Sequence, residues 1–260
     1  SKYKGRGLIA LDKVYEFQTA YCSEEEDLQE YIRKLCRTQR EKYSSMAKRI
    51  PILPKVVNMD FINGESLLAL CAKENKKISE VMLEREITLG ETTKEEVYKK
   101  LAYSISIMKN ATTEPIKSPK KSIGGLLGGE AKAIHDEAFK AGAMPLCGGV
   151  LSKAIAYAMA VLEVNASMGL IVAAPTAGSA GVIPGAVLSV CEDYDLGEDA
   201  IYSGLLNASA LGYIVMRNAS VSGAEAGCQA EVGAASAMAA SAIVELLGGS
   251  PEQSLHAASI

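Results

Sequence analysis

The chain has 260 residues, a formal net charge of −4 and 48% hydrophobic residues, a composition typical of a globular protein that buries a sizeable core without disulfides. Lysine and arginine crowd into the first half, and Arg217 alone follows Val164, so there is no continuous basic face and a nucleic-acid partner is excluded. Residues 1–17 carry scattered charges and lack the long apolar run of a leader peptide. We therefore expect a cytoplasmic protein.

Residues 1–54 are expected to form a charged helical segment of unknown role. The capping box Ser23-Glu24-Glu25-Glu26 predicts an amphipathic helix that runs to about Tyr43. Two prolines within residues 51–54 disfavour helix at the residue before each, so this stretch is predicted to be an extended linker. A domain boundary is predicted there, with a second domain over residues 55–260.

The second domain is predicted to be all-α, a multi-helix bundle-like catalytic domain. Ser79 is expected to cap one helix and Thr93, with Glu96, the next. Alanine and glycine dominate the second half, which favours close helix packing through small side chains. The predicted helices cover about 65–74, 79–90, 93–110, 131–141, 149–164, 183–191, 198–216 and 230–247.

A further helix is predicted to open at Ser250, with Pro251 at its first position and Gln253 completing a capping box. The sequence ends at Ile260, barely two turns later, with apolar residues still arriving. We therefore expect that the chain is truncated at this end.

The stretch Glu114–Glu130 holds two prolines, three lysines and four glycines, which predicts a loop. Two interpretations are open for it. It is either a plain hinge or a loop in which glycine N–H groups, such as those of Gly128 and Gly129, close over an anionic ligand.

From Val164 to Cys191 there are 28 residues without a charge, a length that would suit a membrane span. Pro175, Pro184 and four glycines interrupt the stretch, which favours a buried loop between core helices and no membrane. Within it, Pro175–Gly181 forms a turn rich in glycine and hydroxyl groups. Such a turn can donate hydrogen bonds to a small carboxylate, or it can be a helix-to-helix corner whose hydroxyls cap their own backbone.

The six cysteines include no C-x-x-C pair, and five of them fit ordinary buried or surface thiols. Cys228 differs because it lies between Gly227 and Gln229, just ahead of a helix built almost wholly from small residues. This setting suits a metal ligand, although one thiolate cannot hold a metal alone. Neither a nucleotide-binding glycine motif nor a histidine-based triad can be drawn.

Three blocks of the sequence resemble the alpha chain of bacterial iron–sulfur-dependent L-serine dehydratase. They are Val164–Gly185, Asn218–Ser254 and, more loosely, Gly124–Lys132. The first two blocks are long and specific, and the resemblance extends from about Asn58 to Ile260.

The resemblance implies an all-helical domain that converts L-serine to pyruvate and ammonia with a [4Fe–4S] cluster, one ligand of which would be Cys228. It also implies a beta subunit as partner, and we expect an oligomer. The residues expected to bind the substrate are Thr176, Ala177, Gly178, Ser179, Gly181, Gly128, Gly129 and Asn165.

The sequence also departs from the family pattern. The CDPxxG and PCxxRNA segments that usually supply two further ligand cysteines are absent, and Glu130 stands where aspartate is usual. The general base cannot be identified from the sequence. Two alternatives therefore remain open: an inactive helical partner or scaffold, and a related cluster lyase acting on threonine or cysteine.

Overall fold

The computed structural model describes residues 6–10, 14–18 and 59–260, and the chain divides into two compact units, residues 1–56 and 57–260. In the first unit, strands β1 (Arg6–Ala10) and β2 (Val14–Gln18) pair antiparallel, with Arg6 opposite Gln18. This hairpin differs from the helical segment that the sequence predicts for residues 1–54. The predicted helix from Ser23 to Tyr43 and the proline-containing linker lie outside the described residues.

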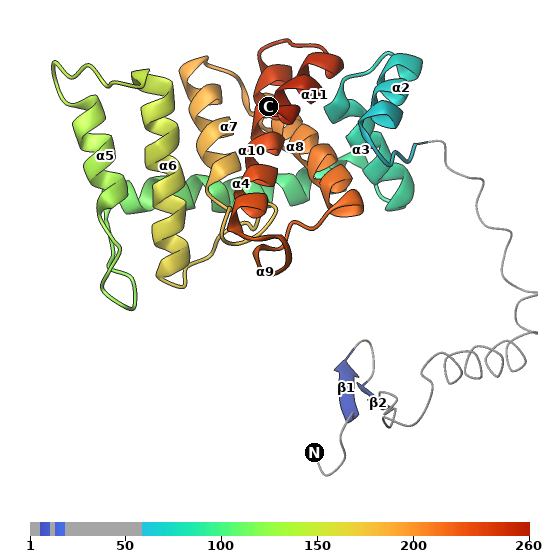
Figure 1. Ribbon diagram of the computed structural model, residues 1–260, viewed down its shortest axis with the longest axis horizontal. Coiled ribbons are helices and arrows are strands. Elements are labelled where there is room, and N and C mark those ends of the chain that lie inside the picture. The colour runs from blue at the N-terminus through green and yellow to red at the C-terminus, as the bar shows by residue number, and fades with distance from the viewer. Residues whose placement is uncertain (1–5, 11–13, 19–58) are drawn as a thin grey trace, which may run out of the picture. The chain divides into compact units, whose positions relative to one another are not determined.

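The described residues of the second unit, 59–260, are all-α, which confirms the predicted fold class. Figure 1 shows the long helix α4 lying across a row that includes α5, α6 and α7, while α10 packs against α7, α8 and α11. The helices are α2 (Gly64–Glu74), α3 (Ile78–Leu89), α4 (Lys94–Lys117), α5 (Glu130–Phe139), α6 (Gly148–Ala166), α7 (Val182–Asp193), α8 (Glu198–Asn218), α9 (Gly223–Ala226), α10 (Cys228–Leu246) and α11 (Pro251–Ser259).

Two predicted helix starts are confirmed by their caps. The N–H of Glu96 donates to Thr93 Oγ1 at 3.3 Å, and the N–H of Gln253 donates to Ser250 Oγ at 3.2 Å. Each cap satisfies a donor that the first turn of a helix cannot pair internally. The serine and threonine signals in the sequence therefore fix where α4 and α11 begin.

Two helix boundaries and one short helix differ from the prediction. Helix α3 begins after Lys77, and Ser79 lies buried inside it, because Glu80 rather than Ser79 reaches back and accepts from the N–H of Lys77 at 2.8 Å. Helix α4 continues to Lys117 with Pro115 buried in its last turn, so the loop begins later than predicted. The short helix α9 is not predicted by the sequence.

The charge-free stretch is divided between the end of α6, an irregular segment over residues 167–181, and α7. Among the described residues, α6 is the one helix long and apolar enough for a membrane span by length and composition. In this unit α6 packs against α4, α5 and α7. The core helix of a soluble protein can have the same length and apolar composition.

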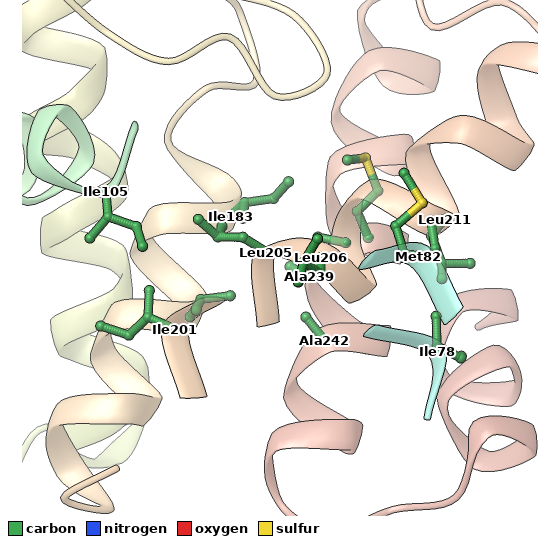
Figure 2. Packing of buried hydrophobic residues seen from close by; sticks show 14 of the residues in the cluster. Ile78, Met82, Ile105, Ile183, Ile201, Leu205, Leu206, Leu211, Ala239 and Ala242 are labelled. Atoms are coloured by element: carbon green, nitrogen blue, oxygen red, sulfur yellow. The ribbon is translucent and has the colours of Figure 1, made fainter. Parts of the chain in front are cut away.

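The core joins helices from both ends of the unit. Figure 2 shows Ile78 and Met82 of α3 facing Leu211 of α8, with side chains of α7, α8 and α10 continuing the same cluster. Small residues bring α6 and α7 together: a Cβ on Gly185 would lie 2.7 Å from the carbonyl oxygen of Ala154. This close approach agrees with the small-residue packing expected from the composition.

One buried carboxylate connects three helices. Glu245 of α10 is 4% exposed, and its Oε2 accepts hydrogen bonds from Asn207 Nδ2 of α8 at 2.8 Å and from the N–H of Ser79 at 3.4 Å. A buried charge must find such partners to be tolerated. Glu245 therefore joins α3 and α8 to the last turn of α10.

Candidate active site

The turn before α7 holds a short series of hydroxyl groups. Ser179 is buried, and its Oγ lies 3.1 Å from Thr176 Oγ1, while the Thr176 hydroxyl donates to the carboxylate of Glu231. The N–H groups of Ala177, Gly178 and Ser179 find no acceptor among the described residues. The turn therefore combines backbone donors that are available to a ligand with hydroxyls that are already oriented.

Glu231 is the residue of this site that the sequence analysis missed. A Cβ on Gly178 would lie 2.5 Å from Glu231 Oε1, and a Cβ on Gly223 would lie 2.6 Å from Oε2. Glycine at both positions is what lets the carboxylate lie between the turn and α9. The signal in the sequence was its spacing: Glu231 follows Cys228 by three residues, so both lie on one face of α10.

Cys228 is the first residue of α10, and its thiol is free and exposed. Gly227 before it has a φ of 86°, a left-handed conformation that glycine adopts without strain. The positive end of the helix dipole favours a negatively charged group such as a thiolate ligand. The predicted metal-binding cysteine therefore lies at the same helix end as Glu231.

Two other described cysteines are in settings that keep the thiol neutral. Burial, with a contribution from the Glu245 carboxylate, raises the pKa of Cys71 to about 11. Burial and the neighbouring Glu192 also raise the pKa of Cys191 above its ordinary value. Cys147 is exposed and precedes α6, where it lines an apolar depression with Leu151, Ala186 and Ile243.

The fit of an iron–sulfur cluster can be tested on these side chains. In residues 59–260, no group of three or more histidine, cysteine, aspartate or glutamate side chains could together hold a metal ion. Cys228 has the exposure and the place of a single cluster ligand. At this site the described residues therefore offer one exposed thiol, Cys228, and a cluster would need further ligands in addition to it.

The end of α6 contacts both the 175–181 turn and the loop that holds Gly128 and Gly129. Asn165 Nδ2 donates to the carbonyl of Ala177 at 3.1 Å. Two residues earlier, the buried carboxylate of Glu163 accepts from the N–H groups of Gly129 at 3.1 Å and Ala131 at 2.8 Å. Asn165 therefore supports the turn from behind, and Glu163 caps the start of α5.

The two loop glycines already have partners within the chain. The N–H of Gly128 donates to Glu130 Oε2 at 2.6 Å, a contact that holds the pKa of Glu130 below its ordinary value. A Cβ on Gly128 would lie 2.3 Å from the carbonyl oxygen of Lys120, which explains glycine there. Since Glu163 takes the N–H of Gly129, neither amide is free in this conformation to bind a substrate carboxylate. Their predicted role in binding substrate remains a prediction.

Gly181 has a different setting from the rest of the turn. A Cβ at this position would lie 2.5 Å from the carbonyl oxygen of Ala158 in α6. The close packing of helix α6 therefore requires glycine at position 181. The structure brings Thr176 and Gly178 against Glu231, which follows Cys228 by three residues in α10, and it places Gly181 against α6.

These residues define an all-helical domain whose polar site lies where a glycine- and hydroxyl-rich turn meets a cysteine at the start of a helix. The family model for serine dehydratase alpha chains matches residues 73–260. The chain therefore belongs to the serine dehydratase alpha chain family, which confirms the resemblance seen in the sequence.

Individual relatives agree with the family match. The chain is 42% identical over 197 residues to the L-serine dehydratase alpha chain of Peptoniphilus asaccharolyticus, covering 76% of this chain and 67% of that protein. It is 40% identical over 200 residues to the probable L-serine dehydratase alpha chain of Bacillus subtilis, covering 77% and 66%. An L-serine dehydratase of Streptomyces coelicolor is 38% identical over 220 residues, covering 82% of this chain and 47% of that protein. The chain thus spans about two thirds of the length of the two alpha chains and about half of the third relative.

Proposed function

We propose that this chain is part of an enzyme that deaminates L-serine to pyruvate and ammonia. The observation that carries the proposal is the meeting of Cys228, Glu231 and the 175–181 turn at one end of α10, in a chain of the serine dehydratase alpha chain family. The names of its relatives support the choice of L-serine and a beta subunit as partner.

The reaction is a β-elimination followed by hydrolysis. Loss of the α-proton and the β-hydroxyl as water leaves aminoacrylate, which tautomerises to an imine and is hydrolysed to pyruvate and ammonia. A [4Fe–4S] cluster with one open iron would supply a Lewis acid for the hydroxyl of serine, and Cys228 would be one of its ligands.

The residues of this chain would bind and orient the amino acid. The N–H groups of Ala177 and Gly178 would donate to the substrate carboxylate, and Ser179 would support the hydroxyl of Thr176 beneath it. Asn165 would hold the turn in place through the carbonyl of Ala177. Fixing the carboxylate in this way sets the distance from the β-hydroxyl to the start of α10, which is the positioning that an elimination needs.

The first test is Cys228→Ala in the full-length protein, purified without oxygen. We expect loss of bound iron and of serine deamination, because one cluster ligand has been removed. Cys147→Ala is the matched control, since its thiol is also exposed and lies at the start of another helix. Iron content and the visible absorption of the cluster are the measurements.

Unchanged iron in Cys228→Ala would contradict the ligand role of Cys228. Wild-type protein that contains a cluster but releases no pyruvate from L-serine would contradict the proposed reaction. Parallel assays with L-threonine and L-cysteine would then decide whether another small β-substituted amino acid is the substrate.

A further inference from the structure

Glu231 places an isolated negative charge against the turn that is proposed to bind substrate. Its carboxylate accepts the hydroxyl hydrogen of Thr176 and lies against Gly178 on one side and Gly223 on the other. It is only half-buried, so a ligand that enters the turn can reach it.

No positive side chain neutralises this charge within residues 59–260. None of the ion pairs there involves Glu231. Arg217 is the one lysine or arginine after Val164, and it pairs with Asp60 at 2.9 Å. A half-buried carboxylate without a counter-ion, beside unpaired backbone N–H groups, is complementary to a zwitterion.

The two halves of that complementarity lie close together in the fold. The N–H groups that are both exposed and unpaired belong to Ala177 and Gly178, and the carboxylate of Glu231 touches the same turn at Thr176 and Gly178. The carboxylate and ammonium of an α-amino acid are attached to one carbon atom, so they need an anion site and a cation site at such short separation.

We propose that Glu231 binds the α-ammonium group of the amino-acid substrate. This inference rests on the proposed function, because it names the group within that site that recognises the amino nitrogen. Since Cys228 precedes Glu231 by one helical turn on the same face, an ammonium held at Glu231 would direct the β-carbon of the substrate toward the start of α10.

The test compares L-serine with L-glycerate, in which a hydroxyl replaces the ammonium group. In Glu231→Gln, binding of L-serine should weaken roughly 10- to 100-fold, the loss expected for one charge-assisted hydrogen bond. Binding of L-glycerate should stay unchanged or tighten, because the repelling charge has gone. On full-length protein purified without oxygen and matched for iron content, the KM for L-serine and the inhibition constant of L-glycerate are measured, with calorimetric dissociation constants for any ligand that is not turned over.

Two further variants control the result. Glu231→Asp keeps the charge and should retain most of the preference for L-serine over L-glycerate. Glu225→Gln removes the same charge from an exposed residue of α9 and should change the binding of neither ligand.

Equal weakening of both ligands in Glu231→Gln would overturn the inference and assign Glu231 to support of the turn. Unchanged binding of L-serine would also overturn it. The proposed function fails separately, if wild-type protein binds L-serine but does not deaminate it. The calorimetric comparison of the two ligands still tests Glu231 in that case.

Discussion

The hydroxyls of Thr176 and Ser179 have different tasks, although the sequence offers both as donors to a substrate carboxylate. Thr176 donates to Glu231, and Ser179 lies behind it at 3.1 Å and is 1% exposed. A single hydroxyl has one hydrogen to donate, so Thr176 cannot serve Glu231 and a carboxylate at the same moment. We therefore propose that backbone N–H groups bind the substrate carboxylate and that the two hydroxyls position Glu231.

Thr176→Val tests this arrangement, because valine keeps the shape of threonine and removes the hydroxyl. We expect the KM for L-serine to rise roughly 10-fold, with a smaller rise in Ser179→Ala, which removes only the supporting contact. Ser236→Ala is the control, since its exposed hydroxyl bonds to Val232 within α10. An unchanged KM in both turn variants would show that the turn is a structural corner, the alternative that the sequence leaves open.

Single residues differ in how far the sequence reveals them. Cys228 and the turn stand out because unusual residue types lie in an apolar context. Glu231 contacts a turn 55 residues earlier in the chain, and that contact depends on how α10 packs, which no local pattern encodes. For Gly128 and Gly129 the sequence suggested more than the structure shows. Their glycine-rich pattern suggested an anion site, whereas Glu130 and Glu163 already accept from their N–H groups.

At the scale of elements, helix starts were predictable where a serine or threonine side chain caps the backbone. The predicted helix boundaries were wrong where tertiary packing determines where a helix ends. Pro115 is tolerated inside α4 because it lies in the last turn and is buried, where the loss of one hydrogen bond is offset by contacts. Helix α9 has four residues, too short for any periodicity to show.

The contact between α6 and α7 depends on glycine, which leads to a prediction about stability. Gly185→Ala would place its Cβ 2.7 Å from the carbonyl oxygen of Ala154, so we expect the variant to be destabilised by about 1–3 kcal/mol. Gly233→Ala is the matched control because no atom lies within 4 Å of its Cβ position in α10, and alanine should stabilise the helix by about 0.5–1 kcal/mol. Urea unfolding of both variants measures the difference. Equal stability of the two would contradict the close approach of α6 and α7.

At the scale of the whole molecule, the all-α class was predictable because composition and capping signals agree over residues 57–260. The order in which helices pack was not, since many of them carry similar alanine-rich faces. The chain belongs to the serine dehydratase alpha chain family, and the two long blocks that carry the resemblance, Val164–Gly185 and Asn218–Ser254, build the turn and the start of α10.

Asp60 joins parts of the second unit that are far apart in sequence, and its carboxyl makes the stability of the unit depend on pH. It accepts from Arg217 Nη1 at 2.9 Å, from the Tyr213 hydroxyl at 3.0 Å and from Arg85 Nε at 3.2 Å. Burial raises the pKa of Asp60, but these hydrogen bonds outweigh it and hold the pKa below its ordinary value. A folded-state pKa that is lowered stabilises the unit above the unfolded value of about 3.9, and this contribution is lost as the pH falls through the folded pKa.

Asp60→Asn should therefore destabilise the protein by about 1 kcal/mol at pH 7, a modest figure because the pairs are partly exposed. The difference from wild type should persist at pH 5 and be smaller at pH 3, because below about pH 3.9 the unfolded wild-type chain binds a proton at Asp60 that the folded state resists. Asp195→Asn is the control, because Asp195 lies in a left-handed turn that asparagine also tolerates and takes part in no ion pair of the described residues. Urea unfolding at the three pH values is the measurement. A difference that stayed constant down to pH 3 would mean that the asparagine disturbs packing, and that the charge on Asp60 does not hold α3 and α8 to the start of the unit.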